Sequence, residues 1–310
     1  MHMYKFLKTL PSSKASHPLP ETFRGIFHID NFLYMQYILH KELPMKHDQD
    51  EIRHYIRKKY AAIATSAKTE GGGCCSGGCA CGQSTPSIAE TSAVLGYADT
   101  DVATIPEGAN MGLGCGSPLT FASVKPGEVV LDLGSGGGID CFIARKLVGE
   151  TGSVIGVDMS PEMIELARKN LRKTGYPNIG FRLGEIEHLP VADGSVDVVI
   201  SNCVVNLSLD KQQVFNETYR VLKAGGRLAI SDIVATAELP VEMQEDLRMH
   251  AGCVAGAEHY LVIRHMLERS GFSDIRLYPK DSSKEILNNW VPDGNLEDYV
   301  ASYMIEATKA

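Results

Sequence analysis

Cysteine is the residue type with the clearest chemical potential in this sequence, and its eight copies fall into two groups. Four lie in the glycine-rich run GGGCCSGGCACG: Cys74, Cys75, Cys79 and Cys81. The other four are dispersed: Cys115, Cys141, Cys203 and Cys253. The N-terminus lacks the apolar run and cleavage site of a secretion signal, so we expect a cytoplasmic protein. Cysteines in that compartment more often bind metals, catalyse or undergo redox reactions than form structural disulfides.

The elements that must position these thiols begin at Glu128. Short apolar runs alternate there with helical stretches, in the order EVVLDL, SVIGVD, IGFRL, VDVVIS and GRLAISD. This alternation predicts the α/β class, with a Rossmann-like, doubly wound and mostly parallel sheet. The helix after the second strand has clear end signals, with Ser160 as its cap, Pro161 at its first position and Gly175 at its end.

The sequence pattern divides the chain into four parts. Residues 1–45 are broken by prolines and form an extension. Residues 46–125 hold an amphipathic helix, expected from about Gln49 to Ala67 to serve in packing, and then the Cys-rich and loop segment. Residues 126–234 form the sheet core. Residues 235–310 form a smaller C-terminal cap on the substrate side, with helices expected at VEMQEDLRMH, EHYLVIRHMLERSGF and LEDYVASYMIEATKA and a strand at IRLYP.

The first strand of the core runs into the glycine-rich loop DLGSGGGID. A dinucleotide fingerprint that begins at Gly134 needs glycine at position 139, where the chain has Ile139, so a dehydrogenase is disfavoured. Asp132, Gly134, Gly136 and Gly138 instead follow one another at every second residue. This motif resembles the loop of class I S-adenosylmethionine methyltransferases. Glycines let the backbone approach a ligand, and a carboxylate at the strand end accepts hydrogen bonds from a cationic amino-acid tail.

Two further strand ends complete the predicted cofactor site. Asp158 ends the second strand, where an acidic side chain can bind both ribose hydroxyls. In the class I family the next residue and the end of the third strand contact adenine, and these positions are Met159, Gly184, Glu185 and Ile186. Each residue alone fits a purely structural role in a turn or cap. Together, on successive strands, they indicate S-adenosylmethionine.

Three of the dispersed cysteines follow strands or lie among small residues. The fourth strand ends in SNCVVNLS, so we expect Asn202 and Cys203 beside the bound cofactor, because the carboxyl ends of parallel strands face the ligand crevice. Cys115 is flanked by glycines in MGLGCGSP, and Cys253 lies in HAGCVAGA. Spacing alone leaves open whether these two converge on the crevice. Cys141 is expected to be a small buried hydrophobe.

From about residue 48 onward the sequence resembles the arsenite S-adenosylmethionine methyltransferases, through the motifs GLGCGSP, LDLGSGGGIDCF, VIGVDMSPEMIELARKN, VISNCVVNLSLDKQQVFNETYRVLKAGGRL and AGCVAGA. The resemblance implies methyl transfer to arsenite, giving mono- and dimethylated arsenicals in arsenic detoxification. It implies that Cys115, Cys203 and Cys253 bind As(III) as thiolates. The arsenic lone pair is then the nucleophile, so no general base is required.

The resemblance also assigns a role to the Cys-rich run. It implies that Cys74 or Cys75 forms a disulfide with Cys115, with a thiol reductant such as thioredoxin or a small thiol as co-substrate. A flexible linker with incidental cysteines and a site of arsenic delivery stay open as alternatives. Zinc is disfavoured because the paired C-x-x-C spacing is missing. Cys79 and Cys81 receive no assigned role.

Composition limits the remaining functions. With 30 Lys+Arg against 38 Asp+Glu the net charge is −8, and no basic run indicates a nucleic-acid partner. The most apolar early segment, residues 26–39, is too short to cross a membrane. A methyltransferase for a small organic acceptor such as a quinone or sterol remains an alternative that would not need Cys115 or Cys253. A non-catalytic arsenite-binding protein is the other alternative.

Overall fold

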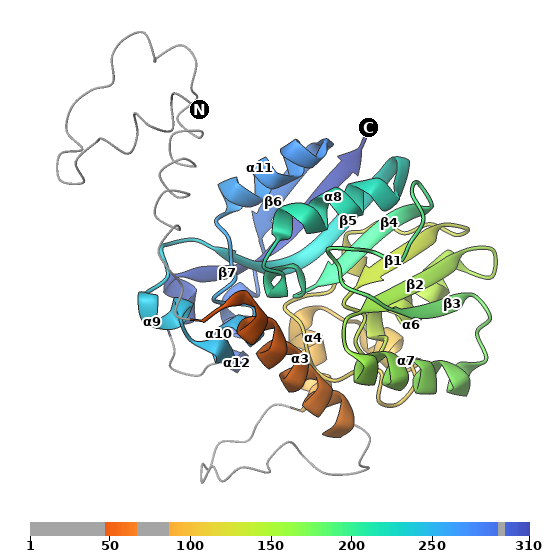
Figure 1. Ribbon diagram of the computed structural model, residues 1–310. Helices are drawn as coiled ribbons and strands as arrows, with labels where there is room; N and C mark the ends of the chain where they lie inside the picture. The colour runs from red at the N-terminus through yellow and green to blue at the C-terminus, as the bar shows by residue number, and fades with distance from the viewer. Residues whose placement is uncertain (1–46, 67–86, 291–294) are drawn as a thin grey trace, which may run out of the picture. The chain divides into compact units, whose positions relative to one another are not determined.

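A seven-stranded sheet lies at the centre of the described chain, as Figure 1 shows. The structure is a computed structural model, and it describes residues 47–66, 87–290 and 295–310. The strand bounds are β1 (Val129–Leu133), β2 (Ser153–Asp158), β3 (Ile179–Leu183), β4 (Val196–Asn202), β5 (Leu222–Ala235), β6 (Phe272–Pro279) and β7 (Val300–Lys309). The spatial order is β3-β2-β1-β4-β5-β7-β6. Strands β1 to β5 run parallel, and β7 is antiparallel to both of its neighbours. The predicted doubly wound, mostly parallel sheet is confirmed.

Helices pack on both faces of this sheet and beside the carboxyl ends of its parallel strands. Their bounds are α3 (Gln49–Ser66), α4 (Ile88–Leu95), α5 (Asp99–Val102), α6 (Ile139–Val148), α7 (Pro161–Thr174), α8 (Lys211–Val221), α9 (Val241–Gln244), α10 (Leu247–Ala251), α11 (Tyr260–Ser270) and α12 (Ser283–Trp290). Short 3-10 turns are η2 (Pro118–Thr120), η3 (Val205–Leu207) and η4 (Leu296–Asp298). Within residues 47–66, 87–290 and 295–310, no helix combines the length and the apolar character that crossing a membrane would require.

The core lies on both faces because the strands are apolar at successive positions. In β1, Leu131 and Leu133 pack in the cluster that includes α8 and α11, while Val130 packs in the cluster that includes α6 and α7. Successive side chains of a strand point to opposite faces, so a strand buried on both sides is a continuous apolar run. This is the physical basis of the runs by which the sequence predicted the parallel strands.

Helix α7 confirms the predicted end signals. The Ser160 side chain accepts a hydrogen bond from the backbone N–H of Met163 at 3.3 Å, and Pro161 occupies the first turn. Gly175 ends the helix with a left-handed φ of +68°. Helix α3, predicted over about Gln49 to Ala67, is confirmed within one residue.

The prediction for the C-terminal part is wrong in one place. The segment LEDYVASYMIEATKA, predicted as a helix, forms η4 and strand β7. Strand β7 lies between β5 and β6 and pairs with both. Its backbone N–H and C=O groups therefore form hydrogen bonds within the sheet, and this pairing overrides the helix propensity of the segment. The segment VEMQEDLRMH forms two short helices, α9 and α10, because Asp246 caps a new helix through the N–H of Arg248.

Candidate active site

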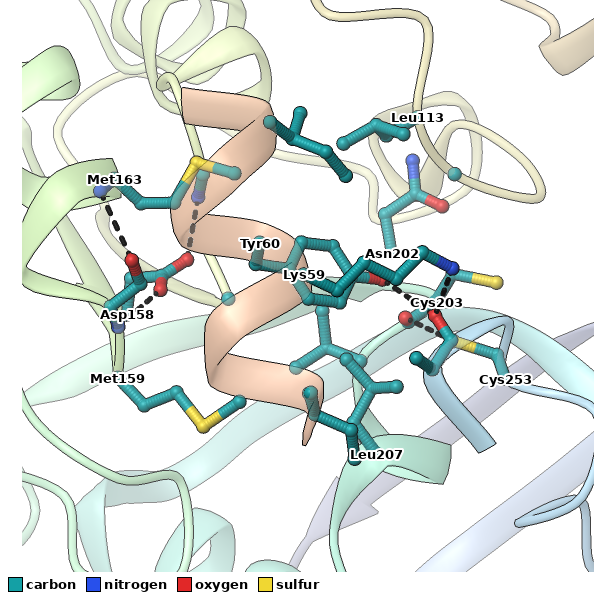
Figure 2. Close-up of a pocket in the computed structure, with 18 of the residues that line it drawn as sticks. Lys59, Tyr60, Leu113, Asp158, Met159, Met163, Asn202, Cys203, Leu207 and Cys253 are labelled. Carbon is teal, nitrogen blue, oxygen red and sulfur yellow. Dashed lines mark hydrogen bonds between the residues drawn. The ribbon is translucent and has the colours of Figure 1, made fainter. Parts of the chain in front are cut away.

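A cavity of about 700 Å³ opens where β1, β2 and β4 end, beside helix α3 (Figure 2). Most of the predicted cofactor residues line it: Asp132, Gly134, Gly136, Asp158, Met159, Glu185, Ile186 and Asn202. Gly138 and Gly184 do not line it. Gly138 instead begins helix α6 with a φ of +100°, and a Cβ at Gly184 would lie 2.7 Å from the Pro190 ring. Both glycines therefore serve the backbone path and have no direct contact with the cavity.

The loop after β1 requires glycine where it approaches the segment that follows β4. Gly134 has a φ of +69°, and a Cβ there would lie 2.3 Å from a methyl carbon of Val204. Left-handed backbone and lack of space both exclude a side chain at this position. The same loop orients Asp158, because the N–H of Gly136 donates to its Oδ2 and the N–H of Ser160 to its Oδ1, each at 2.9 Å. The carboxylate is thereby held at the end of β2, where the ribose was expected.

Two buried carboxylates, those of Asp132 and Asp140, line the cavity without a basic partner among the described residues. Burial raises the pKa of both, and it raises the pKa of Asp140 to about 7. The Cys141 thiol donates to Asp132 at 3.3 Å, and the Tyr97 hydroxyl lies 2.9 and 3.1 Å from the two oxygens of Asp140. A cation in the cavity would supply the missing countercharge. This acid pair therefore fits a cofactor that carries an ammonium and a sulfonium group.

The structure brings Cys115, Cys203 and Cys253 close to one another, and Figure 2 shows Cys203 and Cys253 side by side in the cavity. The sulfurs of Cys115 and Cys203 and a carboxylate oxygen of Asp232 lie within 4.8 Å of one another. The Cys253 thiol lies 2.8 Å from the carbonyl oxygen of Cys203. Cys203 and Cys253 line the cavity, whereas Cys115 is fully buried next to it. Cys203 thus has the thiols of both Cys115 and Cys253 as neighbours, while Asp232 and not Cys253 completes the group of donor atoms within 4.8 Å. Thiols from distant parts of the chain are suitable donors for a soft, thiophilic ion.

Both cysteines that line the cavity have strained backbones. Cys203 has a φ of +57° and Cys253 a φ of +62°, in the left-handed region that residues with a Cβ seldom adopt. Hydrogen bonds hold these conformations, from the Cys203 N–H to the Ser231 carbonyl at 2.8 Å and from the Cys253 N–H to the His250 carbonyl at 3.1 Å. Strain of this kind persists only where the surroundings determine it, and it is concentrated at functional sites.

The thiols of Cys203 and Cys253 are protonated in the ligand-free site. Burial raises the pKa of Cys203 well above its ordinary value, and the neighbouring thiols of Cys115 and Cys253 raise it further. A hydrogen bond with Cys203 lowers the pKa of Cys253, but burial and the charge of Asp232 outweigh it, so this pKa is also raised. A ligand that binds these sulfurs must therefore displace their protons.

The loop that carries Cys115 is attached to β4 and β7. The Cys115 N–H donates to the side-chain oxygen of Asn202 at 3.0 Å, and the Asn202 amide nitrogen donates to the Gly116 carbonyl at 2.6 Å. The Ser302 hydroxyl donates to the Cys115 carbonyl at 2.7 Å. A Cβ at Gly116 would lie 2.0 Å from the Ser231 hydroxyl, so only glycine fits. Asn202, predicted as a cofactor residue, lines the cavity but uses its amide to hold this loop.

Other predicted residues lie outside the described part of the chain. These are the four cysteines of the glycine-rich run: Cys74, Cys75, Cys79 and Cys81. Their predicted part in redox chemistry or arsenic delivery stays a prediction.

Sequence reasoning missed several residues of the cavity and its surroundings. The helix expected over Gln49 to Ala67 was predicted to serve in packing, but in Figure 2 its Tyr60 lies between Asp158 on one side and Asn202 and Cys203 on the other. The placement of Tyr60 follows from helical spacing, since Ile56 and Ile63, four residues before and three after it, also line the cavity. Asp140 ends the quoted loop DLGSGGGID, but the spaced acid-and-glycine motif stops at Gly138 and so did not include it. Tyr97 and Asp232 gave no local signal, because their roles depend on tertiary contacts.

Comparisons with known proteins agree with this geometry. A family model described as a methyltransferase domain matches residues 124–292. An arsenite methyltransferase from Halobacterium salinarum is 51% identical over 271 residues, which cover 84% of this chain and 68% of that protein. An arsenite methyltransferase from Aquipseudomonas alcaligenes is 41% identical over 201 residues, which cover 62% of this chain and 57% of that protein. The chain therefore spans about two thirds of the first relative's length and less of the second.

Two solved structures superpose on this chain. The crystal structure of an arsenic(III) S-adenosylmethionine methyltransferase from Chlamydomonas reinhardtii superposes with a TM-score of 0.53 at 34% identity, covering 73% of this chain and 74% of that one. A phosphoethanolamine N-methyltransferase from Haemonchus contortus, in complex with S-adenosylhomocysteine, superposes with a TM-score of 0.55 at 18% identity, covering 72% of this chain and 57% of that one. At this lower identity the second likeness shows the fold alone.

Proposed function

This chain belongs to the arsenite methyltransferase family, and we propose that it transfers methyl groups from S-adenosylmethionine to trivalent arsenic, giving mono- and dimethylated arsenicals. One observation carries the proposal: Cys203, at the end of β4, lies in the wall of the same cavity as Asp132 and Asp158. A thiophilic substrate held at Cys203 would share the cavity with the cofactor that these acids fit. Detoxification of arsenic is the physiological role that this activity supports.

We propose that the ends of three parallel strands hold S-adenosylmethionine. Asp158 would bind the ribose, and Met159, Glu185 and Ile186 would surround the adenine, since all of them line the cavity. The buried carboxylate of Asp132 would face the cationic amino-acid tail. When bound, the cofactor supplies an electrophilic methyl group on a sulfonium. The chain's own part is to orient that group and to exclude water, because positioning accounts for much of the catalysis of such a transfer.

We propose that Cys115, Cys203 and Cys253 bind As(III). Each As–S bond that forms replaces an As–O bond of arsenite, and the thiol proton leaves with the hydroxide as water. Protonated thiols therefore suffice for binding, in agreement with the raised pKa values of Cys203 and Cys253. The arsenic lone pair is the nucleophile, and it carries no proton, so the site needs no general base.

The remaining parts of the proposal concern the whole protein. Residues 126–234 would bind the cofactor, residues 46–125 would contribute α3 and Cys115, and residues 235–310 would contribute Cys253 on the substrate side. A thiol reductant, in a cytoplasmic setting, would restore the cysteines between cycles, with Cys74 or Cys75 as the relay to Cys115. Support for this relay comes from the family resemblance, which implies a disulfide between a cysteine of the glycine-rich run and Cys115.

A turnover assay tests the proposal. Purified protein is supplied with S-adenosylmethionine, arsenite and excess thiol, and methylated arsenic is separated and counted. We expect product from the wild type and none from Cys203→Ser, while the variant still binds S-adenosylhomocysteine with an affinity close to that of the wild type. A Cys203→Ser protein with full activity would refute the thiolate site. Wild-type protein that binds the cofactor but yields no methylated arsenic would refute the function.

A further inference from the structure

A chain of hydrogen bonds connects the acid pair of the cavity to the loop that carries Cys115. It begins at Asp140, whose carboxylate accepts from the Tyr97 hydroxyl at 2.9 Å. The amide nitrogen of Asn202 donates to the same hydroxyl at 2.9 Å and to the Gly116 carbonyl at 2.6 Å. The side-chain oxygen of Asn202 accepts from the Cys115 N–H at 3.0 Å. Every link is a direct contact, and the chain joins segments that are far apart in the sequence.

Tyr97 is the central link, and its place is fixed by the end of helix α4. The helix ends at Gly96, which has a φ of +93°, and the Tyr97 N–H donates to the Ser92 carbonyl at 3.0 Å. The Tyr97 side chain is 5% exposed and packs in the same apolar cluster as Cys115, Cys203 and Cys253. Burial and the nearby Asp140 raise the pKa of Tyr97 well above its ordinary value, so its hydroxyl keeps its proton at any working pH.

From this geometry we infer that Tyr97 is a positioning residue that couples cofactor binding to arsenic binding through Asn202. The inference rests on the proposed function, because it takes Asp140 as part of the cofactor site and Cys115 as an arsenic ligand. Nothing in the chain of contacts requires Tyr97 to touch the reacting atoms.

The direction of the coupling follows from the single proton of the Tyr97 hydroxyl. A cationic ligand beside Asp140 favours the ionised carboxylate, which can only accept a hydrogen bond. The hydroxyl proton is then committed to Asp140 in a charge-assisted bond, and the oxygen is left to accept from Asn202. A neutral Asp140 could donate to the hydroxyl and so release this arrangement. Cofactor binding therefore stabilises the orientation of Asn202 that holds the Cys115 loop, and arsenic binding should tighten.

The test uses Trp290, the one tryptophan of the sequence, which lines the cavity and gives a fluorescence signal for ligands there. Arsenite is titrated into the full-length protein with and without saturating S-adenosylhomocysteine, which retains the ammonium group. We expect S-adenosylhomocysteine to lower the Kd for arsenite at least about fivefold in the wild type, and arsenite to lower the Kd for S-adenosylhomocysteine by the same factor. In Tyr97→Phe, which removes only the hydroxyl, we expect the coupling factor to fall to less than about twofold.

The matched control is Tyr278→Phe, which also removes a tyrosine hydroxyl bonded to a carboxylate, that of Glu306 at 2.7 Å, but on β6 and outside the cavity lining. It should keep the full coupling factor. Asn202→Asp, which keeps the acceptor for Cys115 but loses the amide donor, should lose coupling as Tyr97→Phe does, and the double variant should lose no more than either single variant. If one single variant folds poorly, the coupling factor of the other single variant still tests the inference.

The outcomes separate the two proposals. Wild-type protein that binds both ligands without coupling would overturn the role of Tyr97, and so would full coupling in Tyr97→Phe. A loss of coupling in Tyr278→Phe equal to that in Tyr97→Phe would also overturn it, because the effect would then be general. Wild-type protein that does not bind arsenite at all would refute the proposed function instead.

Discussion

The buried carboxyl of Asp140 predicts a pH-dependent stability that one substitution removes. Burial raises its pKa from 3.8 to about 7, so between these values the folded protein binds a proton that the unfolded chain has released. Because the folded state binds the extra proton, the free energy of unfolding falls as the pH rises through this window. The slope is at most about 1.4 kcal/mol per pH unit, and the total is on the order of 4 kcal/mol.

The assay is urea unfolding of the ligand-free wild type and of Asp140→Asn at pH 5, 6, 7 and 8. Asparagine has nearly the same shape, has no charge and can still accept from Tyr97, so the difference between the two proteins reports the titration of Asp140 together with its effect on Asp132. We expect the wild type to lose about 2 to 4 kcal/mol relative to the variant between pH 5 and pH 8. Stability curves that stay parallel within about 0.5 kcal/mol over this range would refute the buried, unpaired carboxylate.

Three further predictions concern the Cys115 loop and the thiols. Gly116→Ala should weaken arsenite binding at least about tenfold and lower the free energy of unfolding by about 1 to 3 kcal/mol, because the added Cβ would overlap the Ser231 hydroxyl. The control Gly180→Ala, with open space around it, should change neither the binding nor the stability. Equal effects of the two substitutions would contradict this. Ser302→Ala should cost about 1 to 3 kcal/mol in urea unfolding by leaving the buried Cys115 carbonyl unpaired, and no loss would contradict it. The Kd for arsenite, measured by tryptophan fluorescence with saturating S-adenosylhomocysteine so that Asp140 stays ionised, should stay constant within about twofold from pH 6 to 8, because protonated thiols release water and no net proton. A tenfold change per pH unit would show that free thiolates are required.

The sequence predicts the parallel part of the fold and the residues at its strand ends, because both follow from local rules. Apolar runs identified β1 to β5, and the carboxyl ends of those strands identified Asp132, Asp158 and Cys203 as residues of one crevice. Strand β7 was beyond the same rules. Its sequence fits a helix as well as a strand, and the unpaired edges of β5 and β6 decide the outcome.

The rest of the site depends on contacts between distant segments, which single-sequence patterns do not contain. Tyr97 meets Asp140 and Asn202 only in the folded chain, and Tyr60 faces the cavity because α3 packs against α7 and α10. The strand-end rule placed Asn202 beside the cofactor, but only the structure shows that its amide already holds the Cys115 loop. Local rules therefore find residues at the ends of elements, while hydrogen-bond partners need tertiary structure.

The most direct test of the central claim is the number of sulfur ligands that the protein gives to arsenic. X-ray absorption spectroscopy is applied to arsenite-loaded protein freed of excess thiol, in a variant whose glycine-rich run has serine at Cys74, Cys75, Cys79 and Cys81, so that only the described cysteines can bind. The account predicts three As–S bonds, and two bonds plus one As–O bond when Cys253→Ser is added. Three unchanged As–S bonds after that substitution, or an oxygen-only arsenic in the parent, would contradict it.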